Sequence, residues 1–327
     1  MRCFWDERQR AHDPAHEFFN GALHPAADVP GRIDSILAAL PPTEAPDRRS
    51  AEELRAAMRL AHDGEYLDLL ACAHDEWLAE GRTGDVLPYA FPVQRRPLDL
   101  QRIDARVGAY AYDTCAPIAA GTWGALEAGT DTLLAALDAV QGGEHAFALT
   151  RPPGHHAGAA FMGGYSYVNW AAVAALASGR QTAILDLDYH HGNGTQDIVV
   201  WHEGVRFASL HADPRTDYPF FWGHAEESGG NVLNLPLPRG TGVAAYDAAL
   251  AQACEWLGED APDLLVVSFG ADTFEGDPIS HFAIRTGDYA KLGRRCAALG
   301  LPTLVVLEGG YAVDALGHNV AGFLSGF

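Results

Sequence analysis

Six short apolar runs constrain the fold of this 327-residue chain more than any other feature of its sequence. Each run ends in polar residues, and stretches with helical spacing separate most of the runs. Continuous apolar runs of this length indicate strands buried on both faces, and the helices between them indicate parallel crossover connections. The pattern predicts an α/β fold, a single domain whose doubly wound, mainly parallel sheet is covered by helices on both faces. The runs are residues 146–149, 182–187, 205–210, 232–237, 264–269 and 303–307, and the helical stretches include 168–177, 243–257 and 288–299.

The chain ahead of the first run has a different organisation. Residues up to about 80 show helical spacing with polar interruptions, for example at 33–40 and 51–60, and helical spacing returns at 123–140. Between them, residues of about 81–106 carry two glycines, three prolines and the pair Arg95-Arg96, with little periodicity. Long ordered loops in compact domains are usually functional or interfacial. We therefore expect an inserted loop of that kind at about 81–106.

Charge and cysteine content narrow the classes of partner and compartment. The formal net charge of −21 repels phosphate backbones and attracts cationic ligands, although acidity can also serve solubility alone. We therefore expect no nucleic-acid partner. The sequence contains no stretch of 18 apolar residues, so we expect no membrane partner. Five scattered cysteines without a CxxC pair are typical of reduced thiols, and we expect a cytoplasmic protein.

Chemically reactive side chains follow nearly every apolar run, at the point where the expected strand ends. In an open parallel sheet, ligands bind outside the carboxyl ends of the strands, so these side chains should gather at one edge. Each residue could be explained singly by packing, but their joint placement predicts a functional site. The residues are His155 and His156 after the first run, Asp186, Asp188, His190 and Asn193 after the second, His211 and Asp213 after the third, Asp272 after the fifth, and Glu308 and Tyr311 after the sixth.

Asp188 and His190 form the natural start of a metal site. Residues two apart at a strand end point to the same side, and an oxygen with an imidazole nitrogen is a suitable half-site for Zn²⁺. Asp272 is the best candidate for a third ligand. Three protein ligands leave a position open for water or substrate, which marks a catalytic metal site. The same set of ligands would also suit Fe²⁺, Mn²⁺ or Co²⁺.

The remaining reactive residues can be assigned complementary roles around such a metal. A histidine of the His155-His156 pair could act as general base and then general acid, and Asp186 could orient one of the two imidazoles. Tyr311 could donate its hydroxyl to a developing oxyanion, or could simply form an aromatic wall. Two loops carry aromatic residues that could clasp a thin aliphatic chain or belong to the core. These loops are Gly163-Gly164-Tyr165 and Pro219-Phe220-Phe221.

Four motifs occur in an order that resembles the histone deacetylase and acetylpolyamine amidohydrolase family, which has the arginase/deacetylase fold. They are RPPGHHAG at 151–158, DLDYHHGNGTQ at 186–196, SFGADTFEGDP at 268–278 and EGGY at 308–311. The resemblance runs over nearly the whole chain and includes the segment from Pro30 to Arg32. It implies one zinc-dependent deacetylase domain over residues 1–327, a hydrolase that removes acetyl groups from amines.

The resemblance also implies roles for individual residues. Zn²⁺ is expected on Asp188, His190 and Asp272, one ion per chain. His156 is the expected general base and acid, and His155, paired with Asp186, the electrostatic assistant. Asn193 stands where some members have an aspartate. Tyr311 should polarise the acetyl carbonyl. Structural K⁺ is expected at one site made by Asp186, Ser209 and the carbonyls of Asp188, His190 and Leu210, and at a second made by carbonyls near Val199, His202 and Val205 with Asn231.

Within the family, the chain most resembles the bacterial acetylpolyamine amidohydrolases, through segments such as 90–96 and 108–110. In those enzymes the insertion builds a dimer interface that narrows the active-site mouth, so we expect a homodimer and small acetylated polyamines as substrates. Gly164, Tyr165 and Phe221 should line the tunnel, and Asp104 or Asp113 should read distant ammonium groups. Ile279 is apolar where a polyamine-selective relative carries a glutamate. Broader acyl-lysine deacetylation is therefore the alternative.

Two further classes of function stay open at this point. A binuclear manganese ureohydrolase shares the fold, but that chemistry needs more carboxylates at the strand ends. A non-catalytic sensor of acylated amines would use the same pocket without turnover, but every expected catalytic residue is present. Both alternatives are less favoured than a deacetylase.

Overall fold

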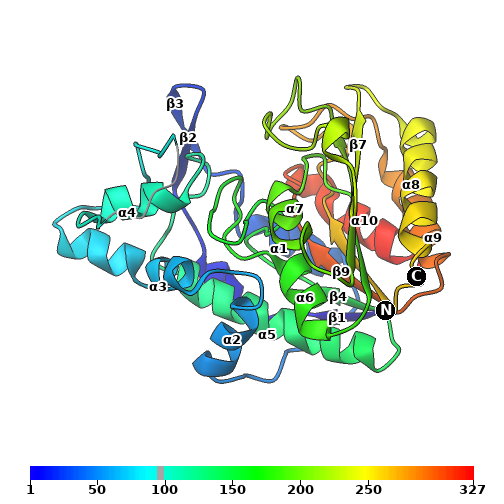
Figure 1. Ribbon diagram of the computed structural model, residues 1–327, viewed down its shortest axis with the longest axis horizontal. Helices are drawn as coiled ribbons and strands as arrows, with labels where there is room; N and C mark the ends of the chain where they lie inside the picture. Colours follow the sequence, from blue (N-terminus) through cyan, green and yellow to red (C-terminus); the bar gives the residue numbers. More distant parts are fainter. Residues whose placement is uncertain (94–98) are drawn as a thin grey trace.

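A seven-stranded, fully parallel sheet organises the protein, as the computed structural model in Figure 1 shows for residues 1–93 and 99–327. The strand order is β1-β4-β9-β8-β5-β6-β7. Six of these strands coincide with the six apolar runs, which confirms the expected doubly wound α/β fold. The strands are β1 (Arg2–Phe4), β4 (Ala146–Ala148), β5 (Thr182–Asp186), β6 (Val205–Ala212), β7 (Val232–Leu237), β8 (Leu264–Phe269) and β9 (Thr303–Leu307).

Alternate residues of the central strands point into two separate hydrophobic cores, one on each face of the sheet. In β9, Leu304 and Val306 belong to one core, and Val305 and Leu307 belong to the other. Because side chains alternate along a strand, both faces must be apolar, and this is why the runs are continuous. The first core is closed by α2 (Ala51–Met58), α3 (Gly64–Ala79), α4 (Ile103–Tyr110), α5 (Thr122–Gln141), α6 (Trp170–Ser178) and α7 (Asn193–Val199), and the second by α1 (Gly31–Ala39), α8 (Val243–Gly258), α9 (Tyr289–Ala297) and α10 (Val313–Leu324).

The amino-terminal part contains elements that the sequence did not reveal. Strand β1 is only three residues long and pairs with β4 at the edge of the sheet. A hairpin of β2 (His16–Phe19) and β3 (Ala22–Pro25) turns at Asn20-Gly21, where both residues have positive φ. Asn-Gly is the usual signal for such a turn, and it was present in the sequence. Three short 3₁₀ helices, η1 (Glu7–Ala11), η2 (Ala225–Glu227) and η3 (Thr286–Asp288), complete the described elements.

The expected loop at about 81–106 is irregular over most of its described part, but α4 begins within it at Ile103. Residues 94–98, which include the basic pair Arg95-Arg96, lie outside the described residues. Among the helices that the structure describes, none has both the length and the apolar character needed to cross a membrane.

Candidate active site

The predicted metal ligands come together at the carboxyl edge of the sheet. Asp188 and His190 follow β5, and Asp272 follows the neighbouring strand β8. One ligand atom from each residue can be chosen so that all three lie within 4.8 Å of one another. The Nδ1 atom of His190 is 3.1 Å from Oδ2 of Asp272 and 3.3 Å from Oδ1 of Asp188. In the described part of the chain, this is the single cluster of three such residues close enough to share an ion.

Backbone groups hold the two carboxylates in place. Oδ2 of Asp188 accepts the N–H of Gly309 at 2.9 Å, and Oδ1 of Asp272 accepts the N–H of Tyr189 at 2.9 Å. The strand ends can approach this closely because glycines lie opposite the carboxylates. A Cβ atom at Gly270 would come within 2.1 Å of Asp188 Oδ2, and one at Gly309 within 2.6 Å of the same atom.

The electrostatics of this cluster fit a bound cation. The side chains of Asp188 and Asp272 are essentially inaccessible to solvent. Burial, and the neighbouring charge of Asp188, raise the pKa of Asp272 to about 7. Two carboxylates withdrawn from water need a compensating positive charge, which a bound divalent ion would supply. Zinc and neighbouring divalent metals accept such a set of ligands, namely two carboxylate oxygens from Asp188 and Asp272 and one imidazole nitrogen from His190.

The two adjacent histidines make different second contacts. Nδ1 of His155 lies 3.0 Å from Oδ2 of Asp186, whereas Nδ1 of His156 lies 2.7 Å from Oδ1 of Asn193. Burial alone would lower the pKa of His155, but the carboxylates of Asp188 and Asp186 outweigh it and raise this pKa to about 10. His155 is thereby suited to carry charge.

His156 is suited to accept a proton. Burial, and the neighbouring imidazoles of His155 and His190, hold the pKa of His156 well below the ordinary histidine value. The Asn193 oxygen can only accept a hydrogen bond, so Nδ1 of His156 carries the proton and Nε2 presents its lone pair. The close approach again depends on glycine, because a Cβ atom at Gly164 would lie 2.4 Å from Cδ2 of His156.

Tyr311 lies on a short loop whose backbone forms hydrogen bonds with buried charged residues. The Asp277 carboxylate accepts the Tyr311 N–H at 2.7 Å, and Gly310, with φ of +123°, turns the backbone in front of the tyrosine. The fully buried Arg32 donates to the carbonyls of Glu308 and Gly310, and its guanidinium lies 4.8 Å from the Tyr311 ring centre. Burial raises the pKa of Tyr311 well above the ordinary tyrosine value, so the hydroxyl keeps its proton.

Arg32, Asp277 and Glu308 were not assigned roles from the sequence. All three are buried, and each acts on the backbone of a loop that carries a reactive side chain. The sequence marked them only through the segments that contain them. Arg32 lies in the Pro30–Arg32 segment, and Asp277 and Glu308 lie in the motifs at 268–278 and 308–311. Nothing in a single sequence indicates which backbone groups such side chains contact.

The aromatic residues expected to line a tunnel have different neighbours in the structure. Tyr165 lies beside Tyr311, with ring centres 5.4 Å apart. Phe221 is 80% exposed, and its ring centre lies 6.3 Å from that of Trp222. Tyr218 of the same loop packs edge-on against both His156 and His190, at 5.1 Å and 5.8 Å. Tyr218 thus contacts both histidines, and the expectation that Phe221 lines a substrate tunnel stays a prediction.

Asp104 and Asp113, the acids expected to bind the distant ammonium groups of a substrate, have partners within the chain. Asp104 is buried and forms ion pairs with Arg82 and Arg102, so its charge is already balanced within the chain. Asp113 accepts hydrogen bonds from the Gly164 and Cys115 backbones and from the Tyr218 hydroxyl. Its carboxylate therefore connects the 163–165 loop to Tyr218. Ile279 lies two residues after Asp277, and the Ile279 N–H donates to Oδ1 of Asp277.

Glu17, on the β2–β3 hairpin, is a buried acid of this region that sequence reasoning missed. Its Oε1 lies 3.2 Å from the Tyr165 hydroxyl, and its Oε2 is buried without a hydrogen-bond partner among the described residues. Burial raises the pKa of Glu17 to about 7. A buried carboxyl with a spare acceptor beside Tyr165 favours a cationic group nearby.

The residues of the two expected potassium sites lie in two separate parts of the structure. Asp186 and Ser209 are paired residues of the neighbouring strands β5 and β6, and the first potassium site stays a prediction. At the second site, the Asn231 amide nitrogen donates to the carbonyls of Val199 and Val205 at 2.7 and 2.8 Å, and lies 3.5 Å from that of His202. The carbonyls and the Asn231 side chain expected at this site therefore lie together, and the second potassium site stays a prediction.

Comparison with known proteins places this geometry in a family. The family model described as the histone deacetylase domain matches residues 26–327. The chain belongs to the histone deacetylase family. The resemblance seen in the four motifs is thereby confirmed, and the parallel sheet is the deacetylase fold.

Full-length relatives of this deacetylase-family chain are similar in both sequence and structure. Acetylpolyamine amidohydrolase 1 of Pseudomonas aeruginosa is 43% identical over 341 aligned residues, covering 100% of this chain and 99% of that protein. Acetylpolyamine amidohydrolase of Mycoplana ramosa is 40% identical, with 100% and 99% covered. The crystal structure of an acetylpolyamine aminohydrolase from Burkholderia pseudomallei matches with a TM-score of 0.94 at 35% identity, covering 100% of this chain and 98% of that one.

Proposed function

We propose that this protein is a zinc-dependent amidohydrolase that deacetylates acetylpolyamines, such as acetylputrescine, acetylcadaverine and acetylspermidine, to give acetate and free amine. The observation that carries this proposal is the convergence of Asp188, His190 and Asp272 at the strand edge that also holds the histidine pair. Full-length similarity to proteins named for acetylpolyamine hydrolysis supports the choice of substrate.

The chain's own residues supply the proton transfers and the charge stabilisation. A divalent ion held by Asp188, His190 and Asp272 would supply Lewis-acid activation of water and of the amide carbonyl. His156 takes the proton of the attacking water at Nε2 and returns it to the departing amine. His155, charged beside Asp186, stabilises negative charge that develops in the transition state. Tyr311 donates its hydroxyl to the oxyanion formed from the acetyl carbonyl.

Replacing Tyr311 with phenylalanine removes the proposed oxyanion donor and leaves the ring in place. We expect kcat to fall by about 100-fold or more, as for the loss of a single oxyanion-hole donor. KM should change little, because the hydrogen bond strengthens only in the transition state. Steady-state kinetics on metal-loaded protein measure both quantities, and a variant with the wild-type kcat would exclude this role for Tyr311.

Replacing Asn193 with aspartate should shift the pH dependence. Only neutral His156 can accept a proton, so activity falls as the pH drops through the pKa of His156. A carboxylate at the Asn193 position favours the imidazolium and raises that pKa, typically by about 1 unit or more for a charge in contact. The acidic limb of kcat/KM should therefore move to higher pH relative to wild type. An unmoved limb would contradict the assignment of His156 as the base.

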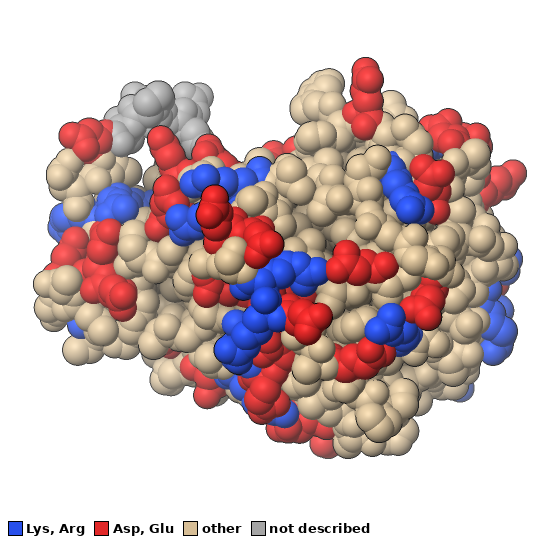
Figure 2. Space-filling view, turned by 90° about the horizontal axis from the view of Figure 1, so that it is seen from below, with Lys and Arg blue, Asp and Glu red and all other residues tan. Residues whose placement is uncertain are grey.

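The preference for small cationic substrates rests on two features of the chain. The whole chain carries a formal net charge of −21. On the face shown in Figure 2, acidic and basic side chains are interspersed over the part that the structure describes. The buried carboxyl of Glu17 lies beside the tunnel residue Tyr165. Measuring kcat/KM for acetylputrescine, acetylcadaverine and an acetyl-lysine peptide on one zinc-loaded preparation tests the preference. A peptide turned over faster than both polyamines would favour the acyl-lysine alternative.

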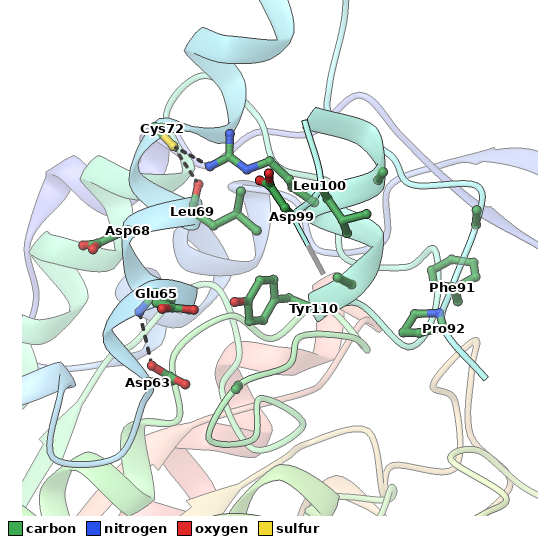
Figure 3. A pocket seen from close by; sticks show the side chains of 15 residues that line it. Asp63, Glu65, Asp68, Leu69, Cys72, Phe91, Pro92, Asp99, Leu100 and Tyr110 are labelled. Atoms are coloured by element: carbon green, nitrogen blue, oxygen red, sulfur yellow. Dashed lines mark hydrogen bonds between the residues drawn. The ribbon is translucent and has the colours of Figure 1, made fainter. Parts of the chain in front are cut away.

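We also propose a homodimer formed through the 81–106 insertion. The described part of this segment exposes Tyr89 and Val93, and the hairpin exposes Leu23, at the end of the molecule where α4 lies in Figure 1. A groove of about 1110 Å³ runs between α3, α4 and the segment, as Figure 3 shows. Apolar and acidic side chains line it together, including Phe91 and Asp99. Light scattering should give the mass of two chains, and a single-chain mass would contradict this proposal.

Two smaller proposals concern the ions and the compartment. Structural K⁺ is proposed at the first predicted site, where Asp186 and Ser209 are paired residues of β5 and β6, and at the second, where the Asn231 side chain contacts the Val199 and Val205 carbonyls. Co²⁺ or Fe²⁺ would satisfy the same three ligands as zinc. All five cysteines are free thiols, which supports the prediction of a cytoplasmic protein.

A further inference from the structure

The carboxyl group of Glu308 joins three segments at the base of the active site. Glu308 directly follows β9 and is fully buried. Its Oε2 accepts the backbone N–H groups of Gly154 and His155, at 2.6 and 3.0 Å. Its Oε1 accepts the hydroxyl of Ser268, on β8, at 3.0 Å. No other side chain described here accepts from the backbone of the two-histidine loop at these positions.

The segments that Glu308 joins carry two groups with different roles in the proposed reaction, the base and the oxyanion donor. Its Oε2 holds the backbone immediately before His156, the proposed base. Along the chain, Glu308 leads directly into Gly309, whose N–H binds the Asp188 carboxylate, and then to Tyr311, the proposed oxyanion donor. The Glu308 carbonyl also accepts a hydrogen bond from Arg32 at 2.6 Å. A single side chain therefore connects the loop of the base to the loop of the donor.

The hydrogen bonds of Glu308 require a side chain of its length with two groups that can form hydrogen bonds at its end. Two N–H groups converge on one oxygen, and a hydroxyl reaches the other, so an amide could replace the carboxylate. The amide oxygen would accept both N–H groups, and the amide nitrogen would donate to the Ser268 oxygen. A shorter acid could not reach the loop without moving it, and alanine would leave buried donors without an acceptor.

We infer that Glu308 is a positioning residue that sets the distance between His156 and Tyr311 through its hydrogen bonds to the Gly154–His155 backbone. Its length and its acceptor oxygens, rather than its charge, perform this role. The inference rests on the proposed deacetylase function. Displacing a reacting group by about 1 Å can cost about 100-fold in rate, so the effect of a misplaced loop should be large.

Three substitutions separate length, charge and acceptor capacity. We expect Glu308→Gln to keep kcat within about threefold of wild type, because the amide preserves the three contacts. We expect Glu308→Asp to lower kcat about tenfold and Glu308→Ala about 100-fold, with KM nearly unchanged, because only transition-state alignment is lost. Glu255→Ala, at an exposed acid on α8, is the matched control and should behave as wild type.

Each variant is loaded with zinc, and its metal content and thermal unfolding are measured beside acetylputrescine kinetics. If Glu308→Ala does not fold, the kcat values of the Gln and Asp variants alone test the inference. An Asp variant as active as wild type, or a Gln variant as impaired as the Ala variant, would overturn the inference, because charge would then be the property that matters. Wild-type protein without any turnover would instead contradict the proposed function.

Discussion

Replacing Asp188 with alanine is expected to abolish metal binding and turnover together. The substitution removes one of three ligands and leaves His190 and Asp272, and two ligands hold zinc far more weakly than three in a catalytic site. It also removes the acceptor for the Gly309 N–H, so the Tyr311 loop loses a second anchor. Metal content after gel filtration and the rate of acetate release measure the two effects on one sample.

The control for this experiment is Asp75→Ala, because Asp75 is an exposed acid on α3. It should keep one metal ion per chain and the wild-type rate. If Asp188→Ala retains a full equivalent of zinc, the three residues identified at the strand edge are not the ligands. If it loses the metal yet keeps its rate, the reaction does not depend on that ion.

Replacing His156 with alanine should leave the metal in place and remove most turnover. The imidazole lies outside the group of ligands, with its ring centre 6.0 Å from that of His190. Loss of general acid–base catalysis typically costs about 100-fold to 10,000-fold, and both proton transfers of the proposed reaction depend on His156. We therefore expect kcat to fall by about 1,000-fold, with zinc content unchanged.

His318→Ala is the matched control, since His318 is an exposed histidine on α10. The complementary variant, His155→Ala, should be impaired less than His156→Ala if His155 only stabilises charge. The reverse order of effects would exchange the roles of the two histidines. A His156→Ala variant with near-normal kcat would exclude it as the base.

The sheet and its reactive edge could be predicted because they depend on local patterns. Strands buried on both faces need continuous apolar runs, such as 264–269, and parallel strands bring their carboxyl ends to one edge. Asp188, His190 and Asp272 could therefore be brought together from their positions alone. Strand β1 was missed because three residues, Arg2–Phe4, are too few to show a period.

The contacts behind the reactive side chains could not be predicted in the same way. Arg32 reaches backbone carbonyls that lie 276 and 278 residues further along the chain, so no local pattern indicates its partners. Asp104 carries the expected charge, but two arginines balance it. Likewise, Tyr218 and Phe221 are near neighbours in one loop, and only the folded backbone determines which of them packs against His156.

Stepwise addition of zinc to metal-free protein, with acetate release from acetylputrescine as the readout, tests the central claim most directly. The proposed site holds one ion between two aspartates and one histidine. We expect the rate to rise in proportion to added zinc and to level off at one equivalent per chain. A rate that levels off only at two equivalents, or that is the same with and without metal, would contradict a single-ion deacetylase.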